Sequence, residues 1–266
     1  MNLYSDCETL EESLNYLKNA SNQSERNSAA SEIKQHLESA AKELSIERFS
    51  LFENSLFQTL FLLFSSDHTE QRKSGVYAVQ IMTESTSSAS EKKIIKFADA
   101  LSLALVNSTD FLLIQMLAEA IGHVAKYSVV SHVEYVEREL DRSLEWLEGN
   151  VSHRRLAACA VLQQLAENTP SIFFAKSKEF FSLIWLPLRD TKNEVRFSAA
   201  KALSACLAVL KERSFHLQSY CNIYDQICIG LKRKSKEEVH GSLLVTFEML
   251  LHTGDFMLPR FREVMF

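Results

Sequence analysis

Apolar and polar positions follow one another along the chain with the spacing of amphipathic α-helices. Apolar residues recur at i, i+3, i+4 and i+7, which places them on one stripe of a helix. Short polar segments, such as Ser-Ser-Asp-His-Thr at 65–69 and Asp-Thr-Lys-Asn at 190–193, separate the helical stretches and are typical of turns. The pattern predicts an all-α chain of about six helical hairpins. These are expected over residues 5–44, 46–84, 90–126, 131–168, 171–212 and 216–252.

The polar turns recur with a period that favours one architecture. Successive turn residues are separated by 43, 40 and 40 positions, in the order Asp67, Asp110, Asn150 and Asp190. Helical hairpins that repeat every 40 to 47 residues or so are typical of HEAT and armadillo arrays. We therefore expect an α-solenoid, or superhelix, of HEAT/armadillo-like hairpins over residues 1–254. Residues 255–266 are expected to begin a further helix.

The second helix of several hairpins carries an arginine about one turn after its start. Arg155 and Arg196 are each followed at +3, +6, +7 and +10 by small or apolar residues, whereas the third copy has Ile114 at this position. An Asp in the preceding turn can cap the helix, and the arginine can meet that Asp or the Asp of a neighbouring repeat. This recurrence predicts a structural ladder with no catalytic role. Its expected members are Asp67, Arg72, Asn150, Arg155, Asp190 and Arg196.

Composition narrows the possible functions. A formal net charge of −5 opposes nucleic-acid binding, which needs a basic face. Five cysteines without a Cys-x-x-Cys pair indicate reduced thiols in a cytosolic or nuclear protein. The most apolar run, at residues 55–64, is about half as long as a membrane span, so direct membrane insertion is not expected.

The sequence contains no motif that assembles a catalytic, cofactor or metal site. Neither Gly-x-x-x-x-Gly-Lys, Gly-x-Gly-x-x-Gly nor His-Glu-x-x-His occurs, and the eight histidines show no ligand spacing. The elements of a kinase active site are likewise not assembled. We therefore expect no enzyme activity and no cofactor in this chain.

Several blocks of the chain resemble one protein family in family order. They are "HVEYVERELDRSLEWLEGNVSHRRLAACAVLQQLAEN" (132–168), "EFFSLIWLPLRDTKNEVRFSAAKALSACLAVL" (179–210) and "EEVHGSLLVTFEMLLHTGDFMLPRFREV" (237–264). They closely resemble the N-terminal HEAT region of the target-of-rapamycin (TOR) protein kinases. The block from Tyr135 to Trp146 and the His-Gly-Ser-Leu-Leu block at 240–244 are the most specific.

The resemblance implies a scaffold that binds proteins and performs no catalysis. In the family the leading solenoid docks subunits such as raptor, helps the kinase to dimerise, and in animals receives the small GTPase Rheb. The implied location is cytoplasmic, with a nuclear pool and recruitment to lysosomal or vacuolar membranes through partners. The alternative is a free-standing HEAT adaptor unrelated to TOR. The chain stops after about six repeats, so we also expect an exposed apolar end and self-association.

Overall fold

The chain folds as a succession of packed α-helices. The computed structural model describes residues 3–85, 91–128, 133–213 and 217–265. Every regular element within these ranges is an α-helix, which confirms the predicted all-α class, and consecutive helices pack as in a helical repeat array. The helices form two compact units, residues 1–124 and 125–266. The expected first residues of three helices lie outside the described residues, as do the ends of the chain: Met1–Asn2, Ser90, Ser131, His216 and Phe266.

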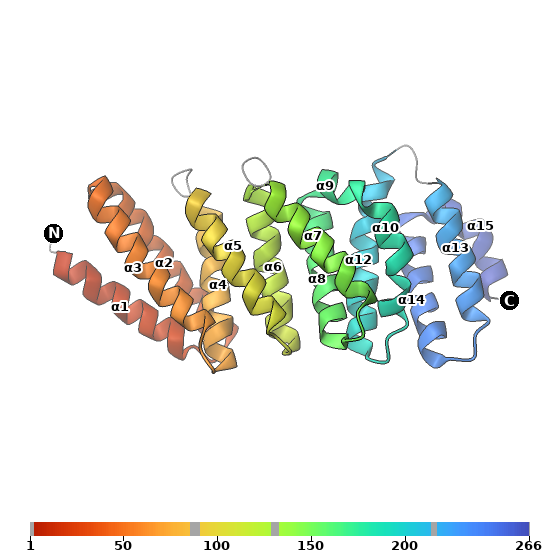
Figure 1. Cartoon of the computed structure of the whole chain (residues 1–266), viewed down its shortest axis with the longest axis horizontal. Helices are drawn as coiled ribbons and strands as arrows, with labels where there is room; N and C mark the ends of the chain where they lie inside the picture. The colour runs from red at the N-terminus through yellow and green to blue at the C-terminus, as the bar shows by residue number, and fades with distance from the viewer. Residues whose placement is uncertain (1–2, 86–90, 129–132, 214–216, 266) are drawn as a thin grey trace. The chain divides into compact units, whose positions relative to one another are not determined.

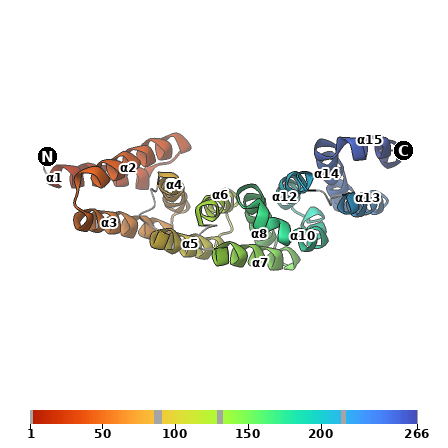
Figure 2. The ribbon, with the colours of Figure 1, turned by 90° about the horizontal axis from the view of Figure 1, so that it is seen from above.

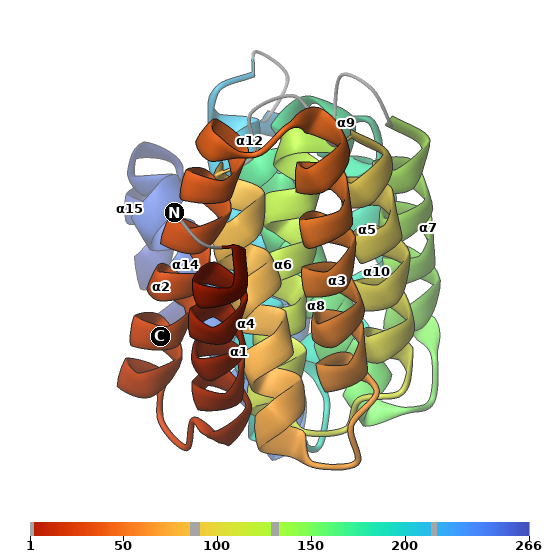
Figure 3. The same cartoon turned by 90° about the vertical axis from the view of Figure 1, so that its left-hand side faces the viewer.

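The first unit consists of packed helices, and polar side chains fix the start of α2. Asn22 caps α2 by accepting a hydrogen bond from the Glu25 amide at 2.9 Å, and Glu25 accepts in return from the Ser21 amide at 2.7 Å. Helix α4 packs against α2 and α3, and α1 lies against α2 and α4 (Figure 3). The helices are α1 (Leu3–Asn19), α2 (Gln23–Glu43), α3 (Ile46–Phe64), α4 (Thr69–Ser85), α5 (Glu91–Val106) and α6 (Phe111–Ser128).

The second unit is also built of packed helices. Its helices are α7 (Val133–Glu148), α8 (Ser152–Asn168), α9 (Pro170–Ala175), α10 (Ser177–Leu183), α11 (Trp185–Leu188), α12 (Asn193–Lys211), α13 (Leu217–Leu231), α14 (Lys236–His252) and α15 (Gly254–Met265). Figure 1 shows them in chain order, and Figure 2 shows α7 and α10 on one side of the unit with α8, α12 and α14 on the other. The second helices of the hairpins therefore form one layer.

Small residues allow α8 and α12 to pack closely. The face of α12 toward the core carries Ala199, Ala202 and Cys206, none of which is exposed to solvent. On α8, Ala158 and Cys159 are equally buried, and α8 is apolar around most of its circumference because it packs against α7, α9 and α12. Small side chains in such a stripe bring two helix axes together, so the alanine-rich sequence of α12 reflects its central place in the unit.

The segment expected as one helix over residues 171–188 is instead three short helices, and this expectation was wrong. Pro187 has no backbone N–H to donate to Leu183, the residue at which α10 ends. Pro170 occupies the first turn of α9, where a proline is tolerated. The breaks let this segment bend over the core while Phe173 and Phe180 stay buried with their ring centroids 5.5 Å apart.

The burial of two cysteines predicts a large difference in thiol reactivity. Burial raises the pKa of the Cys159 thiol, the charge of Asp190 raises it further, and burial also raises the pKa of Cys206. Cys221 and Cys228 are only partly buried. We expect iodoacetamide to modify these two in the native chain at least about tenfold faster than Cys159 and Cys206, since the thiolate is the reactive form. Timed alkylation followed by peptide mass spectrometry measures the rates.

The control for this experiment is the same reaction in urea. Once the chain is unfolded, the four thiols have similar surroundings, and their rates should converge. Alkylation of Cys159 as fast as that of Cys221 under native conditions would contradict the packing of α8 described above.

Candidate functional site

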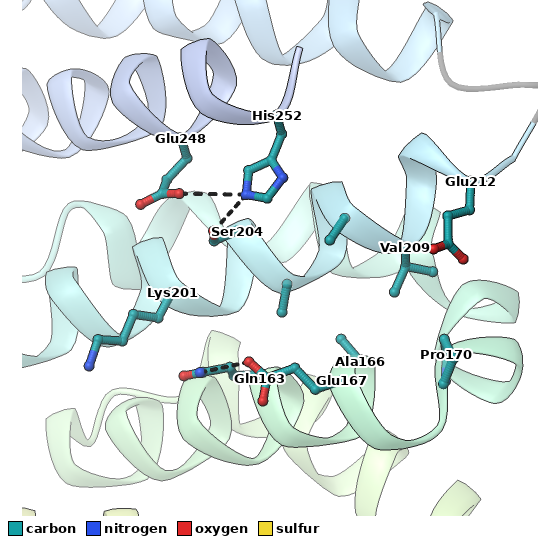
Figure 4. A pocket seen from close by; sticks show the side chains of 12 residues that line it. Gln163, Ala166, Glu167, Pro170, Lys201, Ser204, Val209, Glu212, Glu248 and His252 are labelled. Atoms are coloured by element: carbon teal, nitrogen blue, oxygen red, sulfur yellow. Dashed lines mark hydrogen bonds and ion pairs between the residues drawn. The ribbon is translucent and has the colours of Figure 1, made fainter. Parts of the chain in front are cut away.

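The layer of second helices in the second unit contains a groove, which Figure 4 shows from close by. Its volume is about 560 Å³, and it lies between α8 and α14 with α12 as its floor. The floor is low because the residues of α12 that line it are small: Ala205, Ala208 and Val209. Ala166 and Pro170 extend this apolar surface from α8 and α9. The groove is thus a product of the same small-residue sequence that lets the helices pack closely.

Acidic side chains surround this apolar floor. Glu167 stands on α8, Glu212 follows the end of α12, and Glu248 belongs to α14. Glu167 accepts hydrogen bonds from the Gln163 and Gln164 amides at 2.9 and 3.2 Å, so its carboxylate is held in place. Among the residues that line the groove, these three carboxylates face one lysine, Lys201, and one histidine, so the groove carries a net negative charge.

Ser204, His252 and Glu248 form a polar cluster on one wall of the groove (Figure 4). The Ser204 Oγ and the His252 Nε2 are 2.8 Å apart, and the Glu248 Oε2 lies 3.9 Å from the same Nε2. A hydrolytic triad needs its carboxylate on the other ring nitrogen, where it orients the imidazole and fixes its tautomer. Because serine and carboxylate meet one nitrogen here, the cluster ties α12 to α14 and has no triad geometry.

An exposed apolar stripe runs along α14 beside the groove. Leu243, Phe247 and Leu251 are 44%, 56% and 62% exposed and are spaced by four residues, which places them on one face of the helix. Phe247 precedes Glu248 and Leu251 precedes His252, so the stripe borders the acidic wall. Phe197 on α12 is 50% exposed as well. Large apolar side chains gathered at the surface are characteristic of contact sites for other molecules.

The arginines singled out by the sequence link successive second helices of this unit. Arg155 on α8 donates from Nε to the Asp190 Oδ2 at 2.7 Å, and a second guanidinium nitrogen pairs with the same oxygen. Arg196 on α12 donates to the backbone carbonyl of Asp190 at 2.5 Å and to the His240 Nδ1 on α14 at 2.8 Å. The Asp190 Oδ1 accepts from the Lys192 amide at 2.8 Å, which fixes the turn before α12. Asp190 therefore connects α8 with α12, and Arg196 connects α12 with α14.

The first unit contains a related series of contacts that uses other residues. Arg26 on α2 is buried and forms an ion pair with Glu70 on α4. Lys73 donates to Glu70 at 2.9 Å and lies 3.6 Å from Asp110, whose Oδ1 caps α6 by accepting from the Leu113 amide at 2.8 Å. The hydrogen bond from Lys73, with a smaller contribution from Arg26, holds the pKa of the Glu70 carboxyl below its usual value.

The other expected ladder residues are placed differently. Arg72 donates to the Thr69 Oγ1 at 3.3 Å within its own helix, and Lys73 makes the contact to the next hairpin instead. Asp67 and Asn150 are exposed turn residues. Of the six residues, the structure brings Arg155, Asp190 and Arg196 together. The groove was not anticipated, because its residues lie at separate helix positions without a motif.

In the part of the chain that the structure describes, no three His, Cys, Asp or Glu side chains are placed to hold a metal ion. None of the helices in the same ranges combines the length and hydropathy needed to cross a membrane.

Comparison with known proteins gives a consistent set of relatives. The "Serine/threonine-protein kinase TOR" of Oryza sativa is 33% identical over 239 residues, which are 88% of this chain and 10% of that protein. The "Serine/threonine-protein kinase tor1" of Schizosaccharomyces pombe is 32% identical over 252 residues, 93% of this chain and 11% of that protein. The "Serine/threonine-protein kinase TOR2" of Saccharomyces cerevisiae is 27% identical over 253 residues, which are 90% of this chain and 10% of that protein. No protein-family model matches the chain. The chain spans about one tenth of the length of these curated relatives.

Proposed function

Because the chain is homologous to part of the TOR kinases, we propose that it is the N-terminal HEAT-repeat scaffold segment of such a kinase. In this role it docks protein subunits of a TOR complex, of the raptor type, and takes part in assembly of the kinase dimer. A Rheb-type GTPase is a further proposed partner in animals. Phosphotransfer belongs to a kinase domain outside this chain, and the segment contributes surface contacts to nutrient and growth signalling.

The observation that carries this proposal is the extent of the homology along the chain. The TOR relatives align with 88% to 93% of its residues at 32% to 33% identity, although these residues are only about one tenth of each relative. The acidic groove and the exposed stripe on α14 support a role in binding proteins, because exposed aromatic and leucine side chains anchor interfaces. The proposed location is cytoplasmic, with recruitment to lysosomal or vacuolar membranes through partners.

The size of the native polypeptide tests the proposal directly. An antibody against this segment should detect a band many times heavier than 30.3 kDa in a cell lysate, and a raptor-type subunit should co-precipitate with it. A band near 30.3 kDa that co-precipitates no TOR subunit would overturn the proposal in favour of a separate adaptor. The isolated chain serves as the control in a kinase assay and should transfer no phosphate above background.

A further inference from the structure

We propose that the acidic groove of the second unit, together with the stripe Leu243–Phe247–Leu251, is a docking site for a basic amphipathic helix of a protein partner. The inference rests on the proposed scaffold function and names the chemistry of a ligand for this surface. Neither the homology nor the ladder of arginines indicates where on the chain such a partner binds. The position is indicated by the groove, by the charges around it and by the adjacent apolar stripe.

The charges around the groove favour a cationic ligand. Glu167, Glu212 and Glu248 line it together with a single lysine, Lys201. An acidic peptide, a nucleic acid or an anionic membrane would be repelled by three carboxylates around an apolar floor. A lysine or arginine side chain would meet carboxylates along the groove, and electrostatic complementarity of this kind favours a specific partner and speeds encounter.

One of these carboxylates has an unused acceptor. The Glu248 side chain is 13% exposed, and its Oε2 is buried without a hydrogen-bond partner in the described structure. The His252 Nε2 lies 3.9 Å from this oxygen, which is beyond hydrogen-bond distance. A buried acceptor without a donor is unfavourable, and a bound ammonium or guanidinium group would satisfy it.

The stripe on α14 accounts for the apolar side of the proposed ligand. Leu243 and Leu251 are eight residues apart, so the stripe extends over about 12 Å of helix at 1.5 Å per residue. A partner helix that presents apolar residues at i, i+4 and i+7 or i+8 matches both the spacing and the length. Its basic residues, on the neighbouring face, would then point into the groove beside Glu248.

The position of Lys201 also sets the direction of the ligand. Lys201 lies at one end of the groove, whereas Glu212 and Pro170 lie at the other (Figure 4). Arg213, which follows Glu212, is placed over the Phe174 ring with its guanidinium carbon 5.0 Å from the centroid. The partner should therefore place basic residues at the end marked by Glu212 as well as beside Glu248, and a neutral or acidic residue next to Lys201.

The test uses the full chain and two labelled peptides of about 14 residues, or about 21 Å of helix. One contains only leucine and lysine in amphipathic helical register, and the other has glutamate in place of every lysine. Fluorescence anisotropy should show binding of the lysine peptide and none of the glutamate peptide. Combined Glu167→Gln, Glu212→Gln and Glu248→Gln substitutions should raise the Kd at least about tenfold, and Phe247→Ala alone should raise it about tenfold.

Matched substitutions in the first unit provide the controls. Glu38→Gln changes an exposed acid and Leu62→Ala a side chain that is 71% exposed, both outside the groove, and neither should alter the Kd by more than about twofold. Circular dichroism establishes that every variant is helical. Equal binding of the lysine peptide to the native chain and the triple variant would overturn the inference, as would binding of anionic vesicles in preference to the peptide. Failure of the lysine peptide to bind, with raptor-type subunits still co-precipitating with the segment in cells, would leave the scaffold function standing and reject only this site.

Discussion

Replacement of Asp190 by alanine is expected to lower the free energy of unfolding of the second unit by about 3–5 kcal/mol. The Asp190 side chain is fully buried, and its partner Arg155 is only 12% exposed. Removal of the carboxylate leaves the guanidinium in place without its counter-charge and removes the acceptor for the Lys192 amide. Urea denaturation monitored by tryptophan fluorescence measures the loss, because both tryptophans, Trp146 and Trp185, lie in this unit.

A matched exposed ion pair separates this effect from a general loss of charge. Asp141 lies 2.9 Å from Lys176, and the two side chains are 59% and 42% exposed. Asp141→Ala should therefore cost less than about 1 kcal/mol. In a double-mutant cycle, Asp190→Ala with Arg155→Met should cost less than the sum of the two single changes. A loss below about 1 kcal/mol for Asp190→Ala would show that the aspartate does not hold α8 to the turn before α12.

The pairing of Arg155 with Asp190 could be predicted because a turn Asp or Asn recurs every 40 residues or so, with an arginine five or six positions after it in several hairpins. The same reasoning selected Arg72 in the first unit, where Lys73 makes the inter-hairpin contact. One residue along a helix is a rotation of about 100°, and a pattern with two adjacent cations does not decide which one faces the next hairpin. Whether Arg72 or Lys73 faces the next hairpin depends on how α4 packs against its neighbours, and this packing cannot be predicted from the local sequence.

Helix positions outside residues 170–188 were predictable to within about two residues, because polar turns separate the helical stretches. Within 170–188 the first break, at Lys176, coincides with a polar run at 176–179, whereas the second, at Ile184, lies in an apolar run and leaves no polar turn. The groove was beyond prediction for a different reason. Glu167 and Glu248 are exposed or partly exposed positions on separate helices, and only the packing of α8, α12 and α14 brings them to one surface.

The second large effect is expected at Gly241, within the His-Gly-Ser-Leu-Leu block that the sequence analysis identified as specific. Helix α14 crosses α11 so closely at this glycine that an added Cβ would lie 2.9 Å from the Leu188 carbonyl carbon and nearer still to its oxygen. These are backbone atoms, which cannot rotate away as a side chain can. Gly241→Ala should therefore destabilise the second unit by about 3 kcal/mol, at the upper end of overpacking costs. By differential scanning calorimetry the Tm should fall by about 6–12 °C.

Two other glycines make this prediction specific to the backbone contact. Gly254→Ala adds a Cβ with nothing within 4 Å, so it should be neutral or slightly stabilising through helix propensity. At Gly230 the added Cβ would meet the Ser242 side chain, so Ser242→Ala should restore part of the stability lost by Gly230→Ala. No side-chain change at Leu188 should rescue Gly241→Ala, since every residue has a carbonyl group. If Gly241→Ala proved as stable as Gly254→Ala, helices α11 and α14 would be farther apart than described. The glycine of the His-Gly-Ser-Leu-Leu block would then not be explained by close helix packing.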